Sequence, residues 1–325
     1  MTSYRAAGVD LEAADHHVTN IAGPVTSTWN ESVVGGFGGF AAGVFLPPGL
    51  KQPVLMMTTD GVGTKLELAR KTGYWGGVGF DLVAMVVDDL AATGARPLGV
   101  VDYMAVGALD PVRDTTIIES IATACLAADC PLLGGETAEH PGTMAPDQVD
   151  LAATALGVVE HGHELGADRV ELGDVVIGLA SPNVRSNGFS LVRAAVGNRD
   201  LSQKIEGTTL GELLLLPSVI YSPAVLRASE AGLVHAAAHI TGGGVESNLA
   251  RVIPAGLRAE IDFESWSVPS VFQLIAARGG VTDHEMWSTF NMGMGFCLVT
   301  PPGQANDVIE LCGHDARVIG QIVSR

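Results

Sequence analysis

The chain has 325 residues, 47% of them hydrophobic, and a formal net charge of −18 from 36 acidic and 18 basic residues. Its length suits about two domains, and its acidity excludes the basic surface that DNA or RNA binding needs. Every apolar run is broken by charge, Gly or Pro before the roughly 20 residues of a membrane-spanning helix, and the N-terminal segment has no secretory pattern. We therefore expect a cytoplasmic protein that binds neither nucleic acid nor membrane.

Predicted strands and helices alternate along the first half of the chain. In chain order they are a strand over 54–60, a helix over 80–95, a strand over 97–106, a helix over 114–129, and strands over 150–160 and 174–182. We expect Asp114 to cap the second helix. The segment between the last two strands is rich in Gly, His and acidic residues, so we place a domain boundary there, giving domains 1–165 and 166–325.

The second half continues the alternation of helical and strand patterns. Its predicted helices cover 190–196, 211–216, 271–280 and 305–313, and its predicted strands cover 257–263, 292–300 and 316–323. Both halves therefore have a mixed α/β pattern.

The stretch TTDGVGTK, residues 58–65, places a carboxylate and an ammonium on one glycine-rich turn. Gly61 and Gly63 allow a tight turn after Asp60, while Thr64 and Lys65 offer a hydroxyl and a cation. The spacing is too short for a Walker A loop. A magnesium-bound phosphate would explain the pair, with the carboxylate on the metal and the ammonium on the phosphate. The alternative is a β-turn with an incidental exposed lysine.

Further carboxylates lie on a predicted helix and at the end of an apolar strand. Asp88 and Asp89 stand between apolar residues, where an ionised carboxylate is costly unless it is paired or bound to a cation; a solvated acidic face is the plainer alternative. Glu136 and Glu139 follow the glycine pair of LLGGETAEHPG, which suits metal binding or proton transfer. Asp60, Asp89 and one more acid would form a magnesium site.

Three glycine-rich stretches remain. The first, VVGGFGGFAAG at 33–43, matches the dinucleotide fingerprint only loosely and is either a flexible loop or a lid over phosphates. The others, VRSNGFSLVR at 184–193 and HITGGGVESN at 239–248, put small polar residues before a helix, where backbone N–H groups favour an anion. Caps without ligands are common, so neither stretch defines a site alone.

These stretches occur together in one order along the chain. They are AGVD (7–10), GGFGGF (35–40), TDGVGTK (59–65), DLVAM (81–85), GGETAEHPG (134–142), SNGFSLVR (186–193), HITGGG (239–244) and TFNMGMG (289–295). The set closely resembles the phosphoribosylformylglycinamidine cyclo-ligase family, the aminoimidazole ribonucleotide synthetases of purine biosynthesis. The resemblance covers nearly the whole chain, and GGETAE with TFNMG is its most specific part.

The resemblance implies an α/β (α+β) subunit of two domains, whose N-terminal domains pair into a β-barrel across a homodimer and whose C-terminal domain is mixed α/β. ATP and Mg²⁺, with a monovalent cation as a further candidate, would meet an anionic ribonucleotide in a cleft lined by both domains. The implied reaction is ATP-dependent cyclisation of formylglycinamidine ribonucleotide to aminoimidazole ribonucleotide through a phosphorylated amide. Such chemistry needs charge neutralisation more than a nucleophilic side chain.

Carried over residue by residue, the resemblance implies three sets of site residues. Asp60, Lys65 and Glu139 would be catalytic, and Asp60, Asp89 and Glu136 would hold magnesium. The ATP-binding residues would be Gly35, Gly36, Gly38, Gly39, Gly61, Gly63, Thr64, Lys65 and Gly135. The substrate-binding residues would be Arg185, Ser186, Asn187, Thr241, Gly242, Gly243, Gly244 and Asn291.

The chain departs from the family pattern on the substrate side. Where the family usually reads His-Ser-Asn-Gly-Tyr, it has Arg185 and Phe189, and a guanidinium that stays charged has no acid–base role. Ser247, Ala250 and Ser288 stand where Glu, Pro and Arg are usual. These changes keep open a paralogue that activates a different amide, a small-molecule kinase or selenophosphate-type synthetase of the same fold, and a non-catalytic nucleotide-binding relative.

Overall fold

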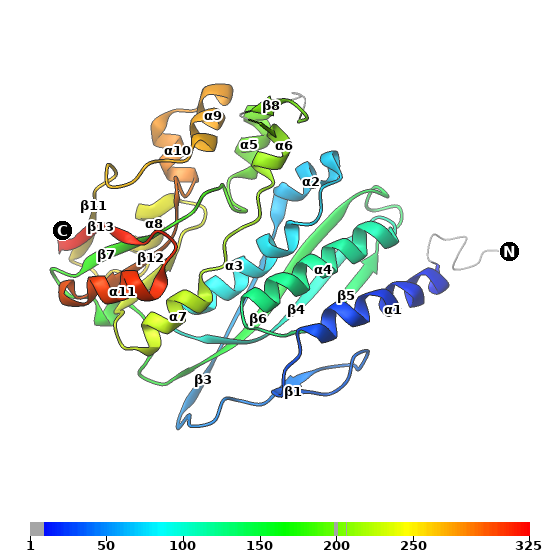
Figure 1. Ribbon diagram of the computed structural model, residues 1–325, viewed down its shortest axis with the longest axis horizontal. Helices are drawn as coiled ribbons and strands as arrows, with labels where there is room; N and C mark the ends of the chain where they lie inside the picture. Colours follow the sequence, from blue (N-terminus) through cyan, green and yellow to red (C-terminus); the bar gives the residue numbers. More distant parts are fainter. Residues whose placement is uncertain (1–9, 198–200, 206) are drawn as a thin grey trace.

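The structure is a computed structural model that describes residues 10–197, 201–205 and 207–325. A four-stranded sheet and the helices against one of its faces make up its first half (Figure 1). The elements are α1 (Leu11–Ser27), β1 (Val33–Val34), β2 (Gly43–Val44), β3 (Pro53–Gly61), the 3-10 turn η2 (Gly63–Lys65), α2 (Leu66–Thr72), α3 (Val78–Ala92), β4 (Arg96–Val106), α4 (Pro111–Ala127), β5 (Leu132–Glu139) and β6 (Val149–Glu160). The sheet runs in the order β3-β6-β4-β5, with β4 and β5 parallel and the other pairs antiparallel.

The second half is built on a five-stranded antiparallel sheet in the order β10-β12-β7-β13-β11. Its elements are η3 (Ala167–Arg169), β7 (Val175–Ala180), α5 (Phe189–Val196), β8 (Lys204–Ile205), β9 (Thr208–Thr209), α6 (Leu210–Leu214), α7 (Ser222–Glu230), β10 (Ala236–His239), α8 (Gly244–Ala250), β11 (Leu257–Ile261), α9 (Ser270–Gly279), α10 (Asp283–Thr289), β12 (Met294–Thr300), η4 (Pro302–Gln304), α11 (Ala305–Cys312) and β13 (Arg317–Ser324). Both halves are therefore mixed α/β, as predicted.

Helix α4 starts earlier than its sequence pattern predicted. The Asp110 carboxylate accepts the N–H groups of Val112 and Arg113, both at 3.1 Å, and Pro111 occupies the first turn, where its missing N–H costs nothing. The predicted cap at Asp114 is wrong. Its carboxylate is buried, where it pairs with Arg113 at 2.7 Å and accepts the N–H of Asp110 at 2.7 Å.

The first sheet has one covered face and one bare face. Helix α3 packs on β3, β6 and β4, and α4 lies beside α3 and α1 on the same side (Figure 1). Because side chains alternate along a strand, the other face carries the remaining residues. Four of its large apolar side chains are exposed, namely Leu55 (54%), Met57 (71%), Val101 (42%) and Tyr103 (42%). An apolar face of this kind marks an interaction surface.

Helix α3 joins the two halves, because it also contacts α7 and β10. Twelve of its residues are buried, including the two aspartates Asp81 and Asp88. The plainer reading of Asp88 as part of a solvated acidic face is therefore wrong.

Within the described ranges, no helix is both long and apolar enough to cross a membrane.

Candidate active site

Adjacent aspartates on α3 have opposite environments. The Asp88 side chain is fully buried, where Oδ1 accepts the N–H groups of Tyr221 and Ser222 at 2.8 Å each and Oδ2 pairs with the Arg185 guanidinium at 2.9 Å. The Asp89 side chain is 40% exposed. With three donors around it, Asp88 has little capacity left for a ligand, whereas Asp89 remains open to solvent.

Asp89 lies beside the end of strand β3. Its Oδ1 is 2.9 Å from Nδ1 of His239, and its Oδ2 is 3.3 Å from the Thr58 hydroxyl. Thr58 and Asp60 are two residues apart on β3, so their side chains point to the same face of the sheet. Asp60 is exposed, and its Oδ1 accepts the N–H of Gly61 at 2.7 Å. The fold thus brings the predicted pair Asp60 and Asp89 to one region.

Lys65 is a buried structural cation. Its Nζ pairs with Asp81 at 2.6 Å and donates to the carbonyl oxygens of Arg185 at 3.0 Å and Leu216 at 2.9 Å. Burial lowers the pKa of Lys65, and the Asp81 carboxylate opposes that shift. All three of its N–H donors are engaged, so the structure supports neither an exposed lysine nor a direct contact with phosphate. We call Lys65, Asp81, Asp88 and Arg185 the interdomain polar cluster.

Glu136 does not join Asp60 and Asp89 within one chain. It lies on β5, and β5 and β3 are the opposite edges of the sheet, separated by two strands and hence by about 14 Å. Glu136 is also paired in register with Tyr103, which points to the bare face. Among residues 10–197, 201–205 and 207–325, no three acidic, His or Cys side chains are grouped to hold a metal. Glu139 accepts the N–H of Leu109 at 2.8 Å.

A pocket of about 720 Å³ lies between α1, the glycine-rich loop and β5, and we call it the glycine-loop pocket. It is lined by apolar residues of α1, α4, β4 and β5 and by residues 36–42 of the loop. Five predicted site residues line it: Gly36, Gly38, Gly39, Gly135 and Glu136. Gly135 has no room for a side chain, because a Cβ there would lie 2.1 Å from Oδ1 of Asp102.

Two polar residues inside the glycine-loop pocket escaped the sequence reasoning. Burial raises the pKa of Asp102 to about 7. Burial also lowers the pKa of His17, whose Nε2 lies 3.1 Å from the Thr137 hydroxyl; in the described part of the chain its Nδ1 has no partner. The signal for Asp102 was a lone carboxylate inside the apolar strand GVVDYMAV. His17 gave no signal, because α1 was not predicted.

Gly61, Gly63 and Thr64 do not border that pocket. Gly63 and Thr64 line a shallower hollow of about 440 Å³ together with Asp150 and Arg193. The Thr64 hydroxyl lies 3.3 Å from the Ser190 hydroxyl, which ties the TTDGVGTK turn to α5. Gly61 packs against β6, where a Cβ would lie 2.7 Å from the Leu151 carbonyl oxygen.

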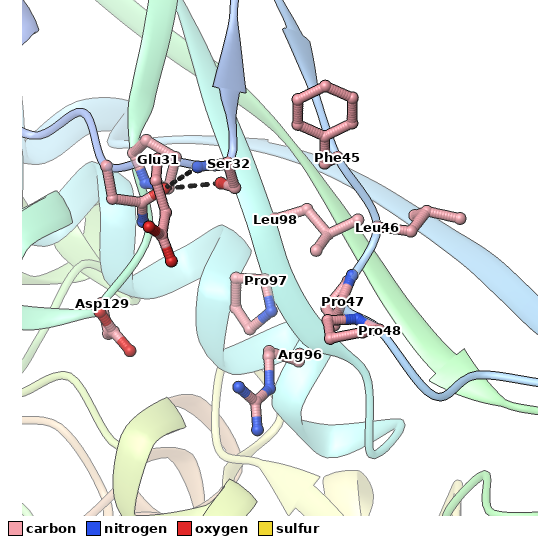
Figure 2. Close-up of a pocket in the computed structure, with 12 residues that line it drawn as sticks. Glu31, Ser32, Phe45, Leu46, Pro47, Pro48, Arg96, Pro97, Leu98 and Asp129 are labelled. Atoms are coloured by element: carbon pink, nitrogen blue, oxygen red, sulfur yellow. Dashed lines mark hydrogen bonds between the residues drawn. The ribbon is translucent and has the colours of Figure 1, made fainter.

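A separate hollow of about 420 Å³ lies where β4 begins, beside the β1–β2 hairpin (Figure 2). Arg96 and Asp129 border it with several prolines, as Figure 2 shows. Among the described residues that line it, none belongs to the predicted site. It therefore carries no part of the assignment.

The predicted substrate-side residues meet at the loops that follow β7 and β10. Gly242 approaches Asn187, since a Cβ there would lie 3.9 Å from the Asn187 side-chain oxygen. Asn248 holds the 241–244 loop by donating to the carbonyl oxygens of Gly242 at 3.3 Å and Gly244 at 2.8 Å. Asn291 is buried and donates to the Asn183 carbonyl at 3.0 Å. These contacts shape the loops.

Other substrate-side positions are buried or crowded. Arg185 is 1% exposed, and its guanidinium faces Asp88 rather than the loops. A Cβ on Gly244 would lie 2.0 Å from the Trp287 carbonyl oxygen, so this glycine is required by close packing. In the described residues, the buried Ser186 hydroxyl has no hydrogen-bond partner. Of the matching motifs, AGVD lies at residues 7–10, and residues 7–9 are outside the described ranges.

The chain belongs to the class of AIR synthase related proteins, whose two domain models both match it. Its N-terminal domain model matches residues 41–159 and its C-terminal domain model matches residues 171–325. The fold is similar to thiamine-monophosphate kinase from Stenotrophomonas maltophilia (TM-score 0.67, 20% identity, 96% of this chain and 94% of that chain). It is also similar to hydrogenase maturation protein HypE in complex with ATP (TM-score 0.65, 16% identity, 95% and 84%).

Sequence similarity narrows the class to one family. The chain is 44% identical over 330 residues to the phosphoribosylformylglycinamidine cyclo-ligase of Synechococcus sp. strain CC9605, covering 99% of this chain and 95% of that protein. The chain belongs to the phosphoribosylformylglycinamidine cyclo-ligase family, so it is an enzyme that forms a carbon–nitrogen bond.

Proposed function

We propose that the protein closes the imidazole ring of formylglycinamidine ribonucleotide with ATP, giving aminoimidazole ribonucleotide, ADP and phosphate in de novo purine biosynthesis. The observation that carries this proposal is 44% identity over 99% of the chain to a cyclo-ligase. Purine synthesis uses soluble ATP and ribonucleotides, so we propose a cytoplasmic location.

The glycine-loop pocket is the proposed ATP site. Its volume suits a nucleotide, and its mixture of an apolar wall with a few polar groups is typical of small-molecule sites. Glycines on two sides, Gly36 to Gly39 and Gly135, let backbone N–H groups approach phosphates closely. The fold neighbour HypE is a complex with ATP, which supports nucleotide use by this architecture.

Magnesium would bind at the Asp60 and Asp89 carboxylates. Both are exposed oxygen donors next to the Thr58 hydroxyl, and Mg²⁺ prefers a few carboxylates with its waters retained. Because the glycine-loop pocket borders β5 and these carboxylates lie at the β3 edge, the metal of one subunit would supply charge neutralisation to phosphates held in the partner's pocket across the proposed homodimer. A monovalent cation stays a further candidate from the family resemblance.

The sequence suggested Lys65 as a phosphate contact. We propose instead that its buried contacts with Asp81 and with the Arg185 carbonyl oxygen hold α3 and the 185 loop in place.

Ring closure proceeds in two balanced steps on the substrate. The amide oxygen attacks the γ-phosphorus of ATP and ADP leaves, which converts a poor leaving group into a phosphate ester. An amidine nitrogen then attacks the same carbon, the C–O bond breaks, phosphate departs and one proton is released. Asn187 and the 241–244 loop would orient the ribonucleotide, and Glu139 remains the candidate acid–base group at the other end of the cleft.

A homodimer would cover the bare face of the first sheet. Its exposed Leu55, Met57, Val101 and Tyr103 are the apolar surface that a second sheet of the same kind would bury, which supports the β-barrel implied by the family resemblance. Glu136 points to that face, so in a dimer it would act toward the partner's site. The proposed division into domains 1–165 and 166–325 falls between the two family-model matches.

Incubation of the purified protein with ATP, magnesium and formylglycinamidine ribonucleotide tests the function. We expect aminoimidazole ribonucleotide and ADP in equal amounts. ADP without the aminoimidazole product would favour a kinase or a paralogue that activates another amide. ATP binding without any ADP would favour the non-catalytic relative.

A further inference from the structure

Arg185 occupies a strained position at the centre of the interdomain polar cluster. Its φ is +62°, a left-handed conformation that non-glycine residues rarely adopt and that persists only where the surroundings impose it. The side chain is 0% exposed, its guanidinium lies 4.9 Å from the Tyr221 ring centroid, and it pairs with Asp88 at 2.9 Å. The cation is therefore held by charge, stacking and backbone together.

The same guanidinium and the Asp89 carboxylate contact the two ring nitrogens of His239 and together determine which of them carries the proton. The guanidinium NH2 nitrogen lies 3.0 Å from Nε2 of His239. A guanidinium has donors but no acceptor, so Nε2 must accept and carries no hydrogen. In the neutral ring the proton is then on Nδ1. That nitrogen is 2.9 Å from Oδ1 of Asp89, to which it donates.

The carboxylate of Asp89 is fixed in turn. One oxygen accepts the His239 proton, and the other faces Thr58 across a long 3.3 Å contact at the exposed side of the helix. A hydrogen bond from an outer residue sets the orientation and basicity of a metal-binding carboxylate. The chain Arg185–His239–Asp89 therefore runs from a fully buried cation to an exposed oxygen.

We propose that Arg185 is a positioning residue: by keeping a hydrogen off Nε2 it locks His239, together with the acceptor-only Asp89 carboxylate, in the Nδ1-protonated tautomer, and His239 thereby holds Asp89 with Oδ2 turned outward for magnesium. A histidine at position 185, the residue usual in the family, could donate or accept and would not impose one tautomer. An arginine can only donate to Nε2, so it is compatible only with the tautomer that carries its hydrogen on Nδ1. This inference rests on the proposed magnesium site, but the tautomer itself is defined without metal.

The first experiment is ¹⁵N nuclear magnetic resonance of metal-free protein labelled at histidine. The chain has nine histidines, so His239→Asn identifies the His239 signals by their disappearance. We expect a hydrogen on Nδ1 and none on Nε2. A hydrogen on Nε2 would overturn the proposal whatever the protein does with magnesium.

The second experiment removes the Arg185 guanidinium without changing the net charge of the interdomain polar cluster. The double variant Asp88→Asn with Arg185→Met deletes both buried charges at once, and Arg185→Lys is the control that keeps a cationic donor. In the double variant we expect an Nε2-protonated population of His239 and a Kd for Mg²⁺, from isothermal titration, about 10-fold higher or more. Arg185→Lys should keep the Nδ1 tautomer. An unchanged tautomer in the double variant would refute the lock.

The third experiment separates the lock from the metal assignment. In His239→Asn the shorter amide can still donate to Asp89, so Mg²⁺ affinity should stay within about 3-fold of wild type, whereas His239→Leu should weaken it about 10-fold or more. Equal affinities in both variants would overturn the positioning role. If wild type and Asp89→Asn bind Mg²⁺ equally, the proposed metal site fails, while the tautomer result stands separately.

Discussion

The interdomain polar cluster and the glycine-loop pocket differ in how their buried charged groups are compensated. In the cluster every charge meets a partner: Lys65 meets Asp81, and Arg185 meets Asp88. In the pocket, Asp102 has no counter-charge among the residues that the structure describes, and burial raises its pKa to about 7. Paired buried charges hold two domains in register, whereas an uncompensated one is a cost that a ligand can relieve.

The largest expected effect is on the stability of the cluster. Lys65→Met leaves the Asp81 carboxylate buried and unpaired, which should lower the free energy of unfolding by about 3–5 kcal/mol in urea titrations. Lys71→Met is the matched control, because Lys71 is 47% exposed and lies 3.8 Å from Glu67; it should cost less than about 1 kcal/mol. Similar losses in both variants would remove the distinction between the two kinds of lysine.

Asp102 in the glycine-loop pocket should make the free energy of unfolding depend on pH. Unfolded aspartate titrates near pH ~4 and Asp102 in the folded chain at about 7. Between these values the folded protein retains a proton that the unfolded chain has released, so the contribution of Asp102 is present below pH ~4 and lost as pH rises through 7, by at most about 4 kcal/mol. Relative to wild type, Asp102→Asn should therefore gain roughly 2 kcal/mol between pH 5 and pH 8. Parallel stability curves would show that Asp102 is not penalised by burial.

The exposed carboxylates should affect turnover rather than stability. Asp60→Asn is expected to reduce ATP turnover about 100-fold, equivalent to about 2.7 kcal/mol, with less than about 1 kcal/mol lost in unfolding. The exposed Asp307 on α11 provides a control, since Asp307→Asn should leave both quantities unchanged. Full turnover in Asp60→Asn would exclude Asp60 from the metal site.

The smallest effect concerns the glycine-rich loop. Gly38 has φ +81° and Gly36 has no such conformation, while both have open space around a Cβ. Gly38→Ala should strain the loop by about 1–2 kcal/mol and raise KM for ATP about 3- to 10-fold with kcat retained, whereas Gly36→Ala should be neutral. Steady-state kinetics decide this. Equal KM values would mean that the loop shape does not contribute to nucleotide binding.

Local patterns predicted much of the fold, because the apolar periodicity of α3, β3, β4 and β6 is contained within each segment. Helix α1 was missed, since its apolar stripe is weak and only Val25 and His17 are buried in it. The cap of α4 was misplaced from Asp110 to Asp114, because two aspartates near a helix start look alike in sequence. The glycines of the pocket were predicted, whereas the pocket's polar groups His17 and Asp102 were not.

By itself the sequence determined the class of fold and the family, and it supplied the candidate residues for phosphate and metal, because motif order and hydrophobic spacing are properties of the chain. Only the tertiary structure decided which charges are buried. Lys65 and Asp60 share one short turn, yet the lysine points into the domain interface and the aspartate to solvent. Asp88 and Asp89 are neighbours on α3, yet one is buried and pairs with Arg185, while the side chain of the other is 40% exposed. The physical reason is that solvation depends on what packs against a side chain: Arg185 lies 97 residues from Asp88 along the chain, and His239 lies 150 residues from Asp89.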